Sequence, residues 1–87
     1  MSKRLYTVKL EPRAERQLLK FPRDIQERIA SRLLQLESNP RPSGIVKLKG
    51  TRARYRLRVG TYRIKYAIQN DLLIINVIEV AHRSESY

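Results

Sequence analysis

The stretch of residues 55–66, YRLRVGTYRIKY, alternates apolar or aromatic with basic residues on both sides of a Gly-Thr pair. Alternation with a period of two is typical of a β-strand that buries one face. A two-residue connection that begins with glycine fits a type II′ turn. The sequence therefore predicts a β-hairpin in which Val59 lies opposite Tyr62 and Arg58 lies opposite Arg63.

Residues that lie opposite each other on antiparallel strands point to the same face of the sheet. One face of this hairpin therefore carries apolar and aromatic side chains, those of Tyr55, Leu57, Val59, Tyr62, Ile64 and Tyr66. The other face carries the cations Arg54, Arg56, Arg58, Arg63 and Lys65. Like charges directly opposite each other destabilise a sheet, and residues 38–70 include no acidic side chain. We expect the cationic face to bind an anion; a solvated strand face is the alternative.

Two helices are predicted before the hairpin. The first covers residues 12–20 and begins at Pro12, since proline suits the first position of a helix. Pro22 ends it and can start the next helix, which stops near residues 38–39. The second helix has one apolar stripe, formed by Ile25, Ile29, Leu33 and Leu36. Arg28, Arg32 and Gln35 fall mostly off that stripe.

Further strands are predicted on both sides of these elements. Residues 5–10 alternate as a first strand, and residues 45–49 are a short extended piece. The apolar run of residues 72–80 is consistent with a central strand buried on both faces. The order is β-α-α-β-β-β. We predict one α+β domain over residues 1–87, with two N-terminal helices packed on a mainly antiparallel four-stranded sheet.

The net charge narrows the choice of partners. Nineteen lysines and arginines against eight acidic residues give a formal charge of +11. A compact chain with this imbalance repels itself and favours polyanions, and nucleic acid is the first candidate. An anionic membrane surface ranks second, because we find no basic helix with a bulky apolar face. Basicity for solubility alone is the remaining alternative.

Cysteine is absent and histidine occurs once, as His82. Disulfides are therefore excluded, and a zinc site is not expected because it usually takes several His or Cys ligands. We predict no metal and no cofactor. Residues 1–4 precede no apolar run of a signal peptide, and no segment approaches the roughly 20 apolar residues that span a bilayer. We expect a cytoplasmic protein with no membrane partner.

The polar tail of residues 81–87 holds three further candidates, His82, Arg83 and Tyr87. A central strand lies beside its neighbours, so the chain that leaves its end is expected to lie near the cationic face of the hairpin. A lone histidine at a strand exit is more often a surface or hydrogen-bonded residue than a catalytic base. Tyr87 closes the sequence, and chain termini often fray.

These features together resemble the RelE/ParE toxin superfamily. The resemblance rests on the element order, the string YRLRVGTYRIKY, the strand that ends in IEVAHR, and the tyrosine that closes the tail. It implies that Arg56 and Arg58 match two basic positions of the second strand, which are commonly lysine in the best-known members. Arg63 matches the arginine of a GxYR element. The tail positions are matched by His82, Arg83 and Tyr87.

The RelE branch cleaves mRNA in the ribosomal A site, so the resemblance implies a ribosome-dependent endoribonuclease. Attack of the RNA 2′-OH on the adjacent phosphorus builds up negative charge, which preset arginines stabilise. Arg63 is assigned to the scissile phosphate, Arg83 to the transition state or leaving group, and Tyr87 to base stacking. Arg56 and Arg58 would hold the backbone and the developing charge. Additional RNA contacts are expected from Arg54, Lys65, Lys47, Lys49 and Arg52.

The general base stays open, because arginine has a pKa above about 12 and is a poor base. His82 or the Tyr87 hydroxyl can take the proton, or catalysis rests mostly on orientation and charge. Three other functions also stay open: a ParE-like poison of DNA gyrase, a non-catalytic nucleic-acid-binding module, and a toxin relic without activity. The basic sheet positions together with the tail Arg and Tyr favour the nuclease.

The resemblance also implies partners. A RelE-like toxin is made with a RelB-like antitoxin whose segment wraps it, and an acidic segment would complement the charge of +11. The toxin–antitoxin complex typically binds operator DNA, and the ribosome and mRNA are the remaining partners. Leu18, Leu19 and Leu34 are candidates for the antitoxin groove, but the sequence alone does not separate them from the core.

Overall fold

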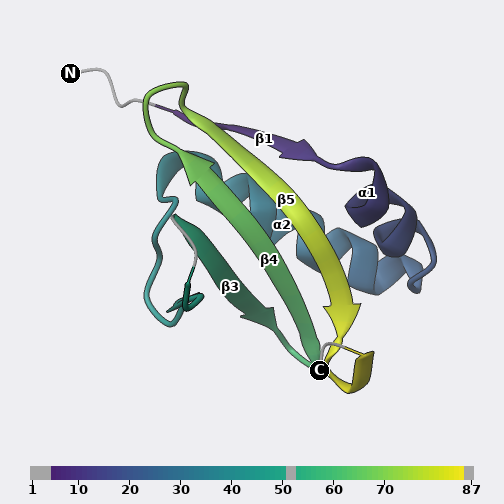
Figure 1. Ribbon diagram of the computed structural model, residues 1–87. Helices are drawn as coiled ribbons and strands as arrows, with labels where there is room; N and C mark the ends of the chain where they lie inside the picture. Colours follow the sequence, from purple (N-terminus) through teal and green to yellow (C-terminus); the bar gives the residue numbers. More distant parts are fainter. Residues whose placement is uncertain (1–4, 51–52, 86–87) are drawn as a thin grey trace.

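Residues 5–50 and 53–85 are described by a computed structural model, in which two helices pack on a five-stranded sheet (Figure 1). The strands lie in the order β1-β5-β4-β3-β2. The elements are β1 (Thr7–Leu10), α1 (Pro12–Leu19), α2 (Arg23–Ser38), β2 (Val46–Lys47), β3 (Arg54–Val59), β4 (Tyr62–Gln69), β5 (Ile74–His82) and the 3-10 turn η1 (Arg83–Glu85). The predicted α+β class is confirmed. Neither helix in these residues is long and apolar enough to cross a membrane.

The sheet has one strand more than predicted. Val46 and Lys47 pair antiparallel with β3, opposite Arg56 and Tyr55 respectively. The extended conformation of this piece agrees with the prediction, but the count of four strands is wrong. An extended segment leaves backbone N–H and C=O groups in need of partners, and the free edge of β3 supplies them. At the opposite edge of the sheet, β1 pairs parallel with β5, whereas all other pairs of described strands are antiparallel.

The β3–β4 hairpin has the predicted register. Val59 lies opposite Tyr62, and Arg58 lies opposite Arg63. Gly60 in the turn has a φ of 60°, a left-handed conformation that is strained for residues with a Cβ atom. The turn chemistry and the alternation therefore agree, which is why local sequence was sufficient to place both strands.

The apolar face of this hairpin forms the centre of the core. The buried residues from the sheet and both helices are Ala14, Leu18, Ile29, Leu33, Leu36, Leu57, Val59, Ile64, Tyr66, Ile68, Ile75, Val77 and Val80. Tyr66 is fully buried, and its hydroxyl donates a hydrogen bond to the Pro40 carbonyl at 2.9 Å. Burial raises the pKa of Tyr66 to about 12. The phenol therefore stays neutral at physiological pH and holds the loop after α2 against the sheet.

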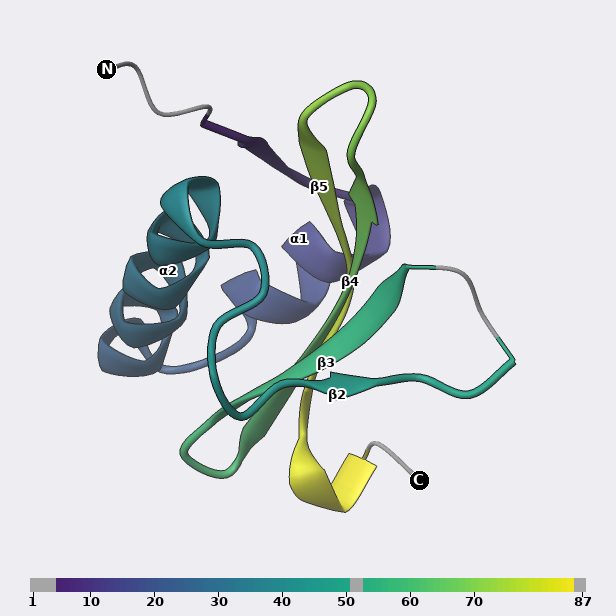
Figure 2. The same ribbon diagram turned by 90° about the vertical axis from the view of Figure 1, so that its left-hand side faces the viewer.

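The strand β5 is less buried than predicted. It begins at Ile74, whereas Leu72 lies in the preceding turn and is exposed. Ile75 and Val77 are fully buried, but Ile74, Asn76 and Glu79 on the other face are only partly buried, and the small Ala81 is the one buried residue there among those described. Both helices lie on the same side of the sheet (Figure 2), and no described helix covers the other side. The prediction of a strand buried on both faces is therefore wrong.

A β-bulge interrupts the pairing of β4 with β5. Lys65 pairs with Glu79, whereas the next residue, Tyr66, pairs with Val77. Ile78 is thus the extra residue. Because one residue has been inserted, side chains after the bulge point to the opposite face from the one that simple alternation would give them. Bulges commonly re-aim side chains in this way.

The end of β5 extends past β1, whose last residue, Leu10, pairs with Val77. Beyond that point, the backbone N–H of Val80 donates to Oε1 of Gln17 on α1 at 2.8 Å. A helix side chain thus takes the place of a neighbouring strand. Since partly buried N–H groups need an acceptor, this bond ties α1 to the open side of β5.

Replacement of Gln17 tests this tie. Gln17→Met removes the acceptor and keeps a similar side-chain volume, so the Val80 N–H is left unpaired. We expect the free energy of unfolding in urea to fall by about 1–3 kcal/mol, the usual cost of an unsatisfied buried donor. Gln35→Met on the exposed side of α2 is the control. Equal losses in both variants would contradict a specific role for the Gln17–Val80 bond.

Candidate nucleic-acid interface

The side of the sheet opposite the helices carries five cations, which we call the arginine face: Arg54, Arg56, Arg58, Arg63 and Lys65. Arg58 with Arg63 and Arg56 with Lys65 form two adjacent rows across β3 and β4. Arg54 and Arg58 are exposed, and the other three are partly buried. The structure thus brings the predicted hairpin cations together on one surface.

A carboxylate also reaches the arginine face, and the sequence reasoning missed it. Glu79 on β5 is the cross-strand partner of Lys65, and its Oε1 lies 3.4 Å from Lys65 Nζ. The two side chains are 15% and 32% exposed, respectively, so water screens the ion pair only in part. The acid comes from a strand outside residues 38–70, the range that holds no acidic side chain. Lys65, predicted to bind RNA, is engaged with Glu79.

His82 lies on the helix-covered face, away from the arginines. Its Cα partner is Tyr62, and the two rings meet edge to face with 5.2 Å between their centroids. Phe21 packs on the same tyrosine, with centroids 4.7 Å apart. Nδ1 of His82 accepts a hydrogen bond from the Ser84 backbone N–H at 3.3 Å, so the neutral ring carries its proton on Nε2. The structure therefore does not bring His82 together with the arginine face.

Arg83 follows directly at the exit from β5 and is exposed. Its backbone N–H donates to the Thr61 carbonyl at 2.7 Å, which fixes the start of the tail beside the hairpin turn (Figure 1). Ala81, two residues earlier, lies opposite Arg63. Arg83 is thus held at the end of the sheet where the row of Arg58 and Arg63 also lies.

Of the remaining predicted residues, Lys47 does not join this surface. Lys47 is paired with Tyr55 and so belongs to the opposite face from Arg56. Lys49 is exposed in the turn after β2. The predicted positions Arg52 and Tyr87 lie outside the described residues.

The arginine face can hold phosphate groups. Guanidinium groups are planar and match two phosphate oxygens at once. Arg58 and Arg63 are directly opposite each other, an unfavourable arrangement that an anion between them would relieve. The side chain of Arg58 already leans toward the turn, where its Nε donates to the Gly60 carbonyl at 3.4 Å.

Two helices on one face of a sheet, with arginines on the other, is the arrangement expected of a toxin of the RelE/ParE superfamily. The model of the family described as ParE toxin of the type II toxin–antitoxin system parDE matches residues 8–87. The chain therefore belongs to this family, and the superfamily predicted from the sequence is confirmed.

Three relatives illustrate the similarity. The protein named toxin RelE1 of Methanocaldococcus jannaschii is 27% identical over 85 residues, which is 94% of each chain. A chain of the RelBE2 toxin–antitoxin complex of Mycobacterium tuberculosis is 28% identical with a TM-score of 0.80, over 91% of this chain and 99% of that one. A chain of the archaeal RelE–RelB complex of Pyrococcus horikoshii is 26% identical with a TM-score of 0.82, over 94% and 99% respectively.

The Glu79–Lys65 pair generates a prediction of opposite effects on stability and binding. Glu79→Gln removes one negative charge from the arginine face and releases Lys65. We expect a lower melting temperature but tighter binding to a short single-stranded RNA. The slope of log affinity against log salt should steepen by about 0.7, the contribution of one further phosphate contact.

Glu15→Gln, on the exposed side of α1, is the matched control, because it changes the net charge equally. Fluorescence anisotropy over a range of salt concentrations measures both slopes. If the two variants steepen the slope equally, the Lys65 pairing does not restrain RNA binding.

Proposed function

We propose that this toxin is an endoribonuclease that cuts mRNA in the ribosomal A site and so inhibits translation. The observation that carries the proposal is the arginine face, where Arg56, Arg58 and Arg63 occupy adjacent ladder positions. Arg83 supports it from the exit of β5, beside the hairpin turn. Cations held by a sheet need little reorganisation during the reaction, which is the condition for electrostatic catalysis.

The proposed reaction is attack of the 2′-oxygen on the adjacent phosphorus. The 2′-OH loses its proton to a base, the 2′-O–P bond forms and the P–O5′ bond breaks. The leaving 5′-oxygen takes up a proton from water, which leaves a 2′,3′-cyclic phosphate and a 5′-hydroxyl. Arg63 would hold the scissile phosphate, with Arg56 and Arg58 beside it on the backbone and the developing charge. Arg83 would stabilise the transition state or the leaving oxygen. In this proposal Tyr87 stacks on a base and aligns the 2′-OH, and no metal ion or cofactor takes part.

The group that takes the 2′-OH proton has several candidates. The sequence left three possibilities open: His82, the Tyr87 hydroxyl, and catalysis mostly by orientation and charge. His82 is paired with Tyr62 on the helix-covered face. Glu79 is a carboxylate on the arginine face, bound to Lys65 at 3.4 Å. Arginine is too weak a base at neutral pH. Cleavage rates of Glu79→Gln and His82→Ala against pH would separate these groups, since loss of the true base removes the acidic limb of the profile.

The family match favours a second candidate, poisoning of DNA gyrase, because the matching family is that of ParE toxins. The arginine face favours the nuclease, because RNA cleavage needs cations held at fixed positions around the scissile phosphate, as the paired strands β3 and β4 hold these arginines. A protein that binds RNA without cutting it, as a simple binding module or an inactive relic, would share this surface. Cleavage on programmed ribosomes distinguishes the nuclease from these alternatives.

We propose a RelB-like antitoxin as the cognate partner, because two of the similar chains come from toxin–antitoxin complexes. An acidic segment would complement the charge of +11, and the complex would bind operator DNA. Of the three leucines considered, Leu18 is 9% exposed and part of the core. Leu34 is 64% exposed and lines a groove with Val8 and Leu10. Leu19 is exposed elsewhere, so Leu34 is the stronger candidate for an antitoxin contact.

Cleavage on programmed ribosomes tests the proposed activity. Wild-type toxin should cut in the A site, as mapped by primer extension, and should leave naked mRNA intact. Arg63→Ala should cut about 10²–10³-fold more slowly, the usual cost of one transition-state donor. Arg23→Ala, on the exposed side of α2, should keep the wild-type rate. A wild-type protein that leaves ribosome-bound mRNA whole but inhibits DNA supercoiling would show that gyrase is the target.

A further inference from the structure

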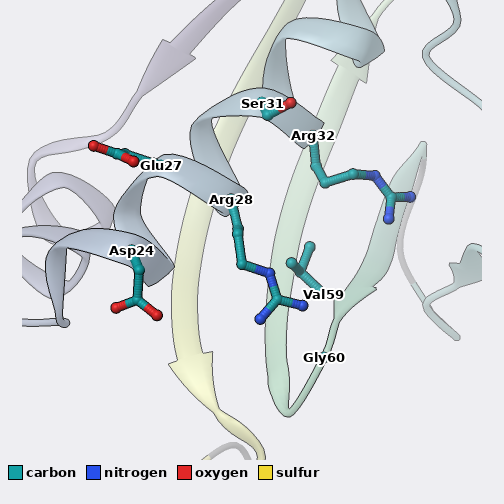
Figure 3. A pocket seen from close by; sticks show the side chains of 7 residues that line it. All are labelled: Asp24, Glu27, Arg28, Ser31, Arg32, Val59 and Gly60. Carbon is teal, nitrogen blue, oxygen red and sulfur yellow. The ribbon is translucent and has the colours of Figure 1, made fainter.

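The helix α2 carries two arginines that face the hairpin turn. Arg28 and Arg32 are one helical turn apart, so they lie on the same side of α2. Both project over the hairpin, where they line a surface hollow with Val59 and Gly60 (Figure 3). A guanidinium nitrogen of Arg28 lies 3.4 Å from the point where a Cβ atom on Gly60 would be. The bare glycine therefore leaves the turn backbone open to this cation.

Neither arginine forms an ion pair within the described part of the chain. Glu27, the residue before Arg28, also lines the hollow. Its carboxylate points away from the two arginines (Figure 3) and pairs with Arg23 at 3.8 Å. Asp24 lines the hollow but pairs with neither arginine. Like charges four residues apart weaken a helix. Asp24, one helical turn before Arg28, offsets part of this cost. No acidic side chain in the described residues lies within ion-pair distance of either arginine, so both guanidinium groups can bind an anion from outside.

Arginines from the hollow and from the arginine face both reach Gly60 at the hairpin tip. Arg58 belongs to the opposite face of the sheet, and its Nε donates to the Gly60 carbonyl at 3.4 Å. Arg28 approaches the same glycine from the helix side. Guanidinium groups therefore flank the tip from both faces. An RNA backbone that runs off the arginine face over the tip would reach Arg28 and Arg32.

We propose that Arg28 and Arg32 form a second binding site for RNA phosphates, beyond the tip of the β3–β4 hairpin. The inference rests on the proposed function in taking RNA as the polyanion on the arginine face. Each guanidinium can grip a phosphodiester group with two parallel hydrogen bonds. The phosphates belong either to the mRNA or to ribosomal RNA, since both offer the same chemistry.

A purely structural role is the alternative, because the long stems of arginine can cover apolar surface such as that of Val59. The test variant is therefore Arg28→Met/Arg32→Met, which keeps unbranched stems and removes the charges. Arg28→Lys/Arg32→Lys keeps the charges and should restore most of the binding. Arg16→Met/Lys20→Met, in α1 and at the residue that caps its end, is the control, with the same spacing and the same change in charge at two exposed positions.

Binding is measured with two probes, a short single-stranded RNA and 70S ribosomes without mRNA, over a range of salt concentrations. For at least one probe, the double methionine variant should raise the Kd about tenfold at low salt. Its salt slope should fall by about 1.4, the contribution of two contacts on a single strand. Its melting temperature should stay within a few degrees of wild type. An effect on the RNA points to mRNA as the source, and an effect on the ribosome alone points to ribosomal RNA.

Unchanged affinity and salt slope for both probes, or equal losses in the α1 control, would overturn the site. It would also be overturned if only the affinity for an acidic antitoxin fell, because the ligand would then be protein. These outcomes are distinct from failure of the proposed activity. Wild-type toxin that binds RNA without cutting it refutes the ribonuclease and leaves the phosphate site standing. Cleavage and binding that are both indifferent to the double substitution refute the site alone.

Discussion

Burial of one face of the β3–β4 hairpin is the interaction on which the rest of the structure depends. Ile64 and Tyr66 are both 0% exposed, and they fix the register of β4. A slip of one residue would turn Arg63 and Lys65 into the core, where an unpaired charge is very costly. The packing that stabilises the fold therefore also holds the cations on the far face, at the regular spacing of the strands.

Local alternation predicted the hairpin because its two strands are joined by a two-residue turn and need no distant partner. The same rule failed for β5. Alternation from the buried Val77 would send Glu79 into the core and His82 to the arginine face. The bulge at Ile78 reverses both, so that Glu79 meets Lys65 and His82 packs on the helix side. One inserted residue, invisible to a period-two pattern, thus decides which acid and which tail residue reach the site.

Other parts of the site were missed because they depend on contacts between distant segments. The strand β2 has only two residues, too few for a pattern to show that Lys47 faces away from the arginines. Arg28 and Arg32 fall off the apolar stripe of α2 and are typical of a solvated helix side. Their position over the hairpin turn follows only from how α2 crosses the sheet. The hairpin cations were predictable, whereas their neighbours were set by tertiary packing.

The parallel pairing of β1 with β5 has a consequence for how the protein is made. Thr7 is paired with Ile74, so the first strand has no partner until the chain has been translated beyond residue 74. Contacts so far apart in sequence form late and slow the folding of a domain. Until β5 is inserted between β1 and β4, β4 lacks the strand that pairs with its outer edge, and Lys65 lacks its partner Glu79. The hairpin arginines are therefore translated, and leave the ribosome, before the strand that completes their sheet is available to pair with them.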